Sequence, residues 1–130
     1  MRVACARWES RGPVRGVIQV AHGRASTDLH QKEAAFLFSS GYVANEAAIS
    51  TIAQLMPACA SFSDEKNHAS MIEGIRRSRV DKHVFRHNDP VDLERRLAAL
   101  DPDRPKLVCS ESVYSMDGDI APLAKLCEVA

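Results

Sequence analysis

The stretch SDEKNHASMIEGIRRS places a serine, an aspartate and a histidine close together before a segment with helical spacing. Ser63, Asp64 and His68 could form a hydrolytic set, but this serine lacks the G-x-S-x-G setting of such nucleophiles. A metal site would need converging ligands, and His83 and His87 bracket a strand-like segment without further partners, so we expect no metal site. The residues alone favour a capping or packing role for His68. The other two histidines are most simply solvated or structural.

A second polar cluster, SSGYVAN at residues 39–45, lies between an apolar run and a helical pattern. Gly41 permits a close backbone approach, and the free N–H groups of a first helical turn attract an anion such as phosphate. A plain strand-to-helix turn capped by serine explains the same residues. Neither G-x-x-x-x-G-K-[ST] nor G-x-G-x-x-G occurs, so a standard nucleotide-binding loop is not indicated.

The third cluster is ESVYSMDGD, in which polar side chains crowd a loop after an apolar run. Glu111, Ser115, Asp117 and Asp119 lie within nine residues, and Gly118 permits a tight turn. Acidic loops also bind calcium, but the spacing of an EF-hand is missing. From the residues alone, the loop is unusual without being assigned to a chemistry.

These clusters need elements to position them, and strand and helix patterns alternate along the chain. Val43 and later apolar residues at helical spacing predict a helix that Pro57 ends, and Asp89 and Pro90 predict the start of another. The patterns predict helices from Asp28 (capped by Thr27) and over residues 43–56, 68–78, 91–100 and 121–130, and strands over 35–38, 59–63, 83–87 and 106–113. Such alternation predicts an α/β architecture of parallel strands with right-handed helical crossovers. In this architecture ligands bind at the carboxyl ends of strands, where all three clusters fall.

The composition is that of an ordinary globular chain: 130 residues, 45% of them apolar and 26% charged, with no net charge. A chain of this size and balance forms one domain at most and has no whole-chain field that favours nucleic acid or a membrane surface. No apolar run is long enough to span a bilayer. Four widely spaced cysteines form no disulfide framework or zinc ribbon, and Cys59 and Cys109 fall in apolar runs that suit small buried hydrophobes. A reducing, cytoplasmic compartment fits best.

The first 26 residues read differently from the rest. They hold five arginines and one glutamate, are punctuated by glycine and proline, and show no sustained period. An organelle transit peptide, an irregular leader and a wrong reading frame ahead of the true coding region all explain this composition. We therefore expect a non-matching, irregular leader at residues 1–26 and a partial domain at residues 27–130.

Taken together, the segments LHQKEAAFLFSSGYVANEAAISTIAQLMP, SDEKNHASMIEGIRRS, VFRHND and ESVYSMDGDIAPLAKLCEVA resemble the 5-aminolevulinate synthase family. The resemblance runs from about Asp28 to Ala130 without an obvious gap. NHAS and SMDGD are shared across the α-oxoamine synthases, whereas IEGIRRS, FRHND and ESVYSMDGDIAPL favour the aminolevulinate member. The resemblance implies the large domain of the aspartate-aminotransferase-like, fold-type I enzymes, which use pyridoxal 5'-phosphate.

The resemblance also implies roles for individual residues. His68 matches the histidine that stacks on the pyridoxal ring, Gly41 and Tyr42 match the turn that holds the cofactor phosphate, and Ser115 matches a serine near the ring hydroxyl. Asn45 and Glu111 lie in the same motifs as further cofactor-site residues. For the acyl-CoA substrate, the resemblance points to Ser63 and Lys82.

The implied reaction condenses glycine with succinyl-CoA to 5-aminolevulinate, CoA and carbon dioxide, the first step of haem biosynthesis by that route. The family's full-length members are homodimers, and the compartment is the cytoplasm or the mitochondrial matrix. The family's cofactor-binding lysine lies in a T-x-G-K setting and its ring-nitrogen aspartate in D-E-x-H, and this sequence contains neither. We therefore expect an incomplete piece of such an enzyme that is inactive by itself. The alternative is a non-catalytic remnant or dimerisation piece.

Overall fold

The computed structural model describes residues 23–29 and 31–130. The chain divides into two compact units, residues 1–40 and residues 41–130. In the first unit, residues 23–29 form a helix and residues 34–38 have no regular structure. Most of the expected leader lies outside the described residues, although residues 23–26 are helical.

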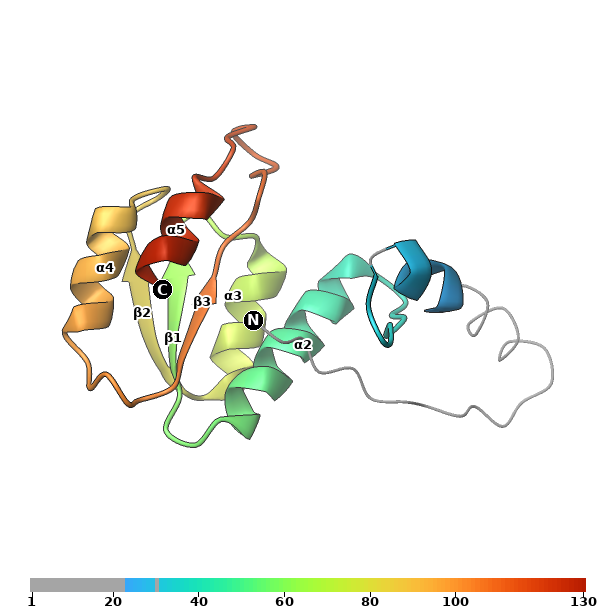
Figure 1. Cartoon of the computed structure of the whole chain (residues 1–130), viewed down its shortest axis with the longest axis horizontal. Helices are drawn as coiled ribbons and strands as arrows, with labels where there is room; N and C mark the ends of the chain where they lie inside the picture. The colour runs from blue at the N-terminus through green and yellow to red at the C-terminus, as the bar shows by residue number, and fades with distance from the viewer. Residues whose placement is uncertain (1–22, 30) are drawn as a thin grey trace. The chain divides into compact units, whose positions relative to one another are not determined.

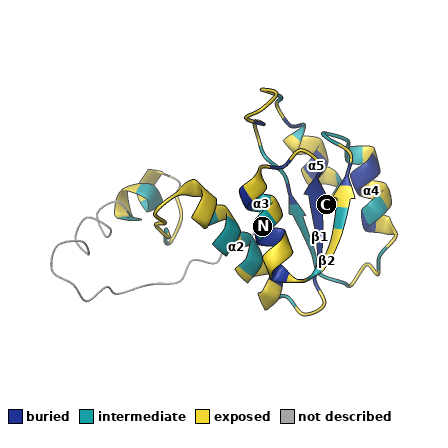
Figure 2. Cartoon of the chain, turned by 180° about the vertical axis from the view of Figure 1, so that it is seen from behind, coloured by how far each residue is buried: buried dark blue, intermediate teal, exposed yellow. Residues whose placement is uncertain are grey.

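The second unit is a three-stranded parallel sheet with helices on both faces (Figure 1). Its strand order is β2-β1-β3, and its elements are α2 (Gly41–Leu55), β1 (Ala60–Asp64), α3 (Ala69–Ser78), β2 (Asp81–Phe85), α4 (Pro90–Ala98), β3 (Lys106–Cys109) and α5 (Leu123–Val129). The chain crosses from β1 to β2 through α3 and returns past β1 to β3 through α4. Right-handed crossovers in opposite directions place these two helices on opposite faces of the sheet, as Figures 1 and 2 show. The predicted α/β architecture with parallel strands and helical crossovers is confirmed.

The main core fills the face of the sheet that α4 and α5 cover. Phe62 of β1 and Phe85 of β2 are fully buried there against Leu93 and Leu97 of α4 and Leu126 of α5. All five residues of β1 are buried (Figure 2), as expected of a central strand with a layer on each side. The core therefore fixes β1, and β1 carries the candidate site at its carboxyl end.

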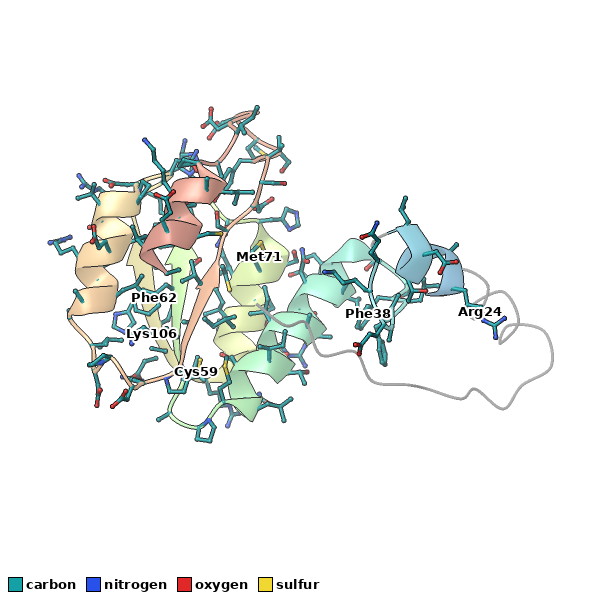
Figure 3. All side chains as sticks on the ribbon, in the orientation of Figure 1. Arg24, Phe38, Cys59, Phe62, Met71 and Lys106 are labelled. Carbon is teal, nitrogen blue, oxygen red and sulfur yellow. The ribbon has the colours of Figure 1, made fainter. Side chains whose placement is uncertain are left out.

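Two cysteines lie in this interior as small hydrophobes, as the sequence predicted. Cys59 and Cys109 are 2% and 5% exposed and unpaired, and Figure 3 shows Cys59 beside the start of β1, at the opposite end of the sheet from the loop that follows β3. Burial raises the pKa of both thiols, that of Cys109 to about 12. Within the described residues, no group of histidines, cysteines and carboxylates is arranged to hold a metal ion, and no helix is both long and apolar enough to cross a bilayer.

Two predictions for the first unit are wrong. The helix spans residues 23–29 instead of beginning at Asp28, and Thr27 lies inside it, where its hydroxyl donates to the carbonyl of Arg24 at 2.7 Å. Residues 35–38 form no strand, because a strand requires a hydrogen-bonding neighbour and the described sheet contains only β1, β2 and β3. Phe36 and Phe38 stay partly exposed, with their ring centroids 5.6 Å apart.

Elements of the second unit follow their predicted positions with shifted ends. β2 ends at Phe85, because His87 already belongs to the turn that follows. β3 ends at Cys109, and Val113 forms only an isolated antiparallel bridge with Ile120. The predicted start of α4 is confirmed, since the carboxylate of its N-cap residue, Asp89, accepts the backbone N–H three residues on at 3.0 Å and a proline opens the helix.

Gly74 lets α3 approach α2 closely, which gives a first testable prediction. A Cβ at this position would lie 3.0 Å from the Cβ of Ile49 and 3.1 Å from the carbonyl oxygens of Asn45 and Glu46. Alanine improves helix propensity by about 1 kcal/mol, but the clash costs about 1–3 kcal/mol. We expect Gly74→Ala to lower the free energy of unfolding, measured by urea denaturation. Gly41→Ala is the control, because its added Cβ would meet nothing within 4 Å and should change stability little; equal effects of the two substitutions would refute this account.

Candidate active site

His68 begins α3 and acts as its N-cap. Its Nδ1 accepts the backbone N–H of Ser70 at 3.2 Å and also lies 2.7 Å from the Ser70 hydroxyl. An imidazole in this position satisfies one of the free N–H groups at the start of the helix. The capping role that the residues favoured is therefore confirmed, and it holds the exposed imidazole in one orientation.

A chain of hydrogen bonds fixes the tautomer of this histidine. Asn45 of α2 donates its amide N–H to the hydroxyl oxygen of Ser70 at 2.9 Å, so the serine proton is free to point to His68. Because Nδ1 accepts from both the N–H and the hydroxyl of Ser70, it carries no proton, and the ring proton lies on Nε2. Asn45 thus acts on His68 through Ser70, a residue that the sequence did not single out although it is part of NHAS.

Two further predicted residues lie against His68. Glu111, which follows β3, accepts the backbone N–H of His68 at 2.5 Å. The ring of Tyr42 meets the His68 imidazole edge-to-face, with centroids 6.2 Å apart. The start of α2, the start of α3 and the end of β3 therefore meet at one corner of the sheet.

The N-terminus of α2 in this corner is suited to an anion. Gly41 opens this fifteen-residue helix, whose first turn contains no acidic residue. The N–H groups of the first turn and the helix dipole give this end partial positive charge. A Cβ at Gly41 would meet nothing within 4 Å, so the space beside the helix start is open to a ligand.

Asn67 holds the turn before His68 in place. It is 5% exposed, and its amide N–H groups donate to the hydroxyl of Ser63 at 3.0 Å and to the carbonyl of Cys109 at 2.8 Å. Its Oδ1 has no hydrogen-bond partner. The structure therefore places Ser63 inside β1, 3% exposed, where its hydroxyl also donates to the carbonyl of Asp64 at 3.0 Å.

Lys82 and Ser115 lie outside this corner network. Lys82 is exposed on the edge strand β2, and its register partner on β1 is Ser61. Since Ser63 is two residues further along β1, Lys82 and Ser63 face the same side of the sheet. Ser115 is exposed in the loop between β3 and α5, which also carries Glu111. Figure 1 shows this loop beyond the carboxyl end of the sheet.

A second network, missed at the sequence level, joins the turns after β1 and β2 to the same loop. The carboxylate of Asp64, 1% exposed, accepts the backbone N–H groups of Lys66 and Asn88, each at 2.9 Å, and a bond from Nδ1 of His87 at 2.8 Å. Nε2 of His87 lies 3.1 Å from Asp119. Burial alone raises the pKa of the Asp64 carboxyl, but these donors outweigh it and lower the pKa below its ordinary value. The motif FRHND contains His87, but its carboxylate partners are distant in sequence.

The fold and the site define a class: a doubly wound α/β domain that presents two helix N-termini and a fixed imidazole at the carboxyl edge of a parallel sheet. The family model for aminotransferase class I and II matches residues 16–130, and the chain belongs to that family.

Comparison with individual proteins confirms the resemblance to the 5-aminolevulinate synthases. The chain is 62% identical over 103 residues to a 5-aminolevulinate synthase of Bradyrhizobium diazoefficiens. The matched region makes up 79% of this chain and 25% of that protein. Over the same share of this chain, it is 55% identical to a non-specific, mitochondrial 5-aminolevulinate synthase of Gallus gallus and covers 16% of that protein. The chain thus spans about a quarter or less of these relatives.

Solved structures of fold-type I enzymes share the fold. A serine palmitoyltransferase from S. paucimobilis with bound PLP–myriocin matches with a TM-score of 0.78 and 40% identity, covering 83% of this chain and 27% of that one. The expected fold class is therefore confirmed for the matched part of the chain.

The capping role of His68 can be tested by mutation. We expect His68→Ala to cost about 1 kcal/mol of unfolding free energy through loss of the N-cap. His68→Asn should retain most of that stability, because asparagine is a strong N-cap residue. Urea denaturation of both variants measures the difference, and equal destabilisation by Ala and Asn would show that the cap contributes nothing.

The buried Asp64 carboxylate should make the chain sensitive to acid. Because its pKa is lowered in the folded state, its stabilising contribution is complete above the unfolded value of about 3.9 and is lost as pH falls through the folded value. We expect Asp64→Asn to cost about 1–3 kcal/mol at neutral pH and less near pH 3. Urea titrations at both pH values check this, with the exposed Asp103→Asn as the control; a cost for Asp64→Asn that is the same at both pH values would contradict it.

Proposed function

We propose that this chain is part of an enzyme that uses pyridoxal 5'-phosphate to condense glycine with succinyl-CoA, giving 5-aminolevulinate, CoA and carbon dioxide. Family membership and the high identity to 5-aminolevulinate synthases support the reaction. Because the chain spans about a quarter of those relatives, the activity is proposed for a protein that contains this segment and not for the 130 residues alone.

The observation that carries the proposal is the convergence of the α2 N-terminus with His68. Gly41 and Tyr42 open a helix beside free space, and the imidazole of His68 is fixed next to Tyr42. A phosphorylated aromatic ring needs an anion site and a flat surface close together. A corner that offers both fits this cofactor.

In this proposal the residues of the chain bind and orient. Backbone N–H groups at Gly41 and Tyr42 would hold the phosphate, and the imidazole of His68 would stack on the pyridine ring. When bound, pyridoxal phosphate withdraws electrons from the α-carbon of an amino acid. Glu111 keeps the backbone of His68 in place, and Ser115 would contact the ring hydroxyl.

Substrate recognition is proposed for Ser63 and Lys82. Lys82 is an exposed cation that can pair with the phosphates of CoA. The hydroxyl of Ser63 is now bonded to Asn67, so contact with the acyl chain requires that bond to be exchanged. We further propose that the full-length protein assembles as a homodimer and works in the cytoplasm or the mitochondrial matrix; a relative named as mitochondrial supports the latter location.

Cofactor binding by the chain itself tests the proposal most directly. We expect pyridoxal phosphate to bind more tightly than pyridoxal, because only the phosphate can use the α2 N-terminus. Gly41→Asp should weaken binding of pyridoxal phosphate by about tenfold through charge repulsion and leave pyridoxal unchanged. Equilibrium dialysis of both compounds against both proteins measures this. Equal affinity of the unmodified chain for the two compounds would refute the phosphate site.

Activity must be measured in a longer protein that contains this segment together with the cofactor-binding lysine. We expect aminolevulinate formation from glycine and succinyl-CoA, and a loss of about 100-fold or more in kcat/KM for His68→Ala. His68→Asn, which keeps the cap, should lose a similar amount, since the ring is missing. An active His68→Asn variant would limit this residue to capping.

A further inference from the structure

His87 occupies a position between two carboxylates that the proposed function does not use. Its Nδ1 lies 2.8 Å from Oδ1 of Asp64, at the end of β1, and its Nε2 lies 3.1 Å from Oδ2 of Asp119, in the loop after β3. The side chain of His87 is only 12% exposed. One imidazole therefore joins the sheet to the loop that carries Ser115.

The chemistry of the partners sets the protonation state. An ionised carboxylate only accepts hydrogen bonds, so both ring nitrogens must donate if both contacts are hydrogen bonds, and only the charged imidazolium can do so. The amide nitrogen of Asn88 also lies 3.1 Å from Nε2, and it can only donate. Nε2 thus faces one acceptor and one donor. A neutral ring accepts from Asn88 and repels Asp119, whereas a protonated ring donates to Asp119.

We propose that His87 is a positioning residue that holds the loop of residues 110–120 through Asp119 when its imidazole is protonated and releases that loop when the imidazole is neutral. Any effect of the loop position on cofactor binding rests on the proposed function, because Ser115 and Glu111, the proposed cofactor-site residues, lie on this loop.

The loop is tied internally to Asp119 by backbone hydrogen bonds. Inside it, the backbone N–H of Tyr114 donates to the carbonyl of Asp119 at 2.9 Å, and that of Gly118 donates to the carbonyl of Tyr114 at 2.8 Å. Ser115 is one of the residues of this turn. Tyr114 is 2% exposed in the core and anchors one side of the turn, so a contact at Asp119 holds the other side of the turn that carries the serine.

Other charged groups around His87 favour the protonated ring on balance. Burial by itself lowers the pKa of His87, but the bonds to Asp64 and Asp119 outweigh it, and the pKa is raised above its ordinary value. The titratable groups that face the ring from the adjoining strand end, turn and loop are Asp64, Glu65, Lys66, Tyr114, Asp117 and Asp119. We call the contact between the protonated His87 and Asp119 the clamp. Since the pKa of His87 is raised in the folded state, the clamp is fully formed below the unfolded pKa of about 6.5 and is lost as pH rises through the folded pKa.

A second contact of the loop behaves differently and serves as a control. Lys66 pairs with Asp117 at 2.7 Å, but both side chains are nearly half exposed. Such a pair is weak and screened by salt, and neither partner changes charge near neutral pH. Loss of this pair should leave the pH dependence of the loop intact.

Amide hydrogen exchange of the 130-residue chain, followed by NMR together with the ring signals of His87, tests the proposal. We expect protection of the Gly118 amide, corrected for intrinsic exchange, to fall by about tenfold as pH rises and the ring signals of His87 report the loss of its proton. Asp119→Ala and His87→Gln should both abolish this pH dependence. Lys66→Gln and His83→Gln should retain it, the latter because the His83 ring stacks on Phe62 and touches no part of the loop network.

Two results would overturn the proposal: protection that does not change while His87 titrates, or a pH dependence that survives in Asp119→Ala. Asp119→Ala also guards against misfolding of His87→Gln, because the side chain of Asp119 is 46% exposed. Dialysis with pyridoxal phosphate separates this proposal from the proposed function. A pH-dependent contact between His87 and Asp119 in a chain that binds no cofactor would support the role of His87 and refute the proposed phosphate site, and cofactor binding without that pH dependence would do the reverse.

Discussion

The carboxylate of Asp64 is the interaction on which the carboxyl edge of the sheet depends. Buried at the end of the central strand, it accepts two backbone N–H groups, one from the turn after β1 and one from the turn after β2, together with the ring of His87. Parallel strands need their loops to converge at this edge, yet nothing in the strand pairing holds the loops there. A buried anion with several donors does so, because each donor that moved away would leave the charge less compensated in a low-dielectric interior.

Two histidines then hold the flanking elements in place, one with a neutral ring and the other with a charged ring. His68 must keep a lone pair on Nδ1 to cap α3, so its role requires a neutral ring. His87 must donate from both nitrogens to join Asp64 to Asp119, so its role requires a charged ring. The carboxylates bonded to the ring of His87 supply that charge preference, whereas the ring of His68 contacts a backbone N–H, a serine hydroxyl and a tyrosine ring, and the Glu111 carboxylate binds its backbone N–H instead. The same side chain thus serves two functions because its neighbours differ.

Signals that act over a few residues predict the helices and strands of the second unit. Contacts between residues far apart in the sequence could not be predicted in this way. Pro57 and the Asp89–Pro90 pair ended and began helices through backbone sterics that act over a few residues. The strand at residues 35–38 failed because strand formation depends on a partner that an apolar run cannot reveal. His87 was taken as solvated or structural, since its carboxylate partners lie 23 and 32 residues away in sequence. The capping role of His68 was readable from its position before a helix, but its proposed contact with a cofactor ring came only from the resemblance.

Packing far from the corner sets the geometry within it. Gly74 brings α3 against the backbone of Asn45 and Glu46, and the side chain of Asn45 then reaches Ser70 on the next helix. Without that close approach, the serine hydroxyl would lose its donor and would be free to rotate away from His68. The orientation of the imidazole is therefore a consequence of helix packing as much as of the cap itself. This explains why a glycine in a helix interior, unfavourable by its own propensity, suits this position: the cost in helix stability is offset by the contact that aligns the two helix N-termini.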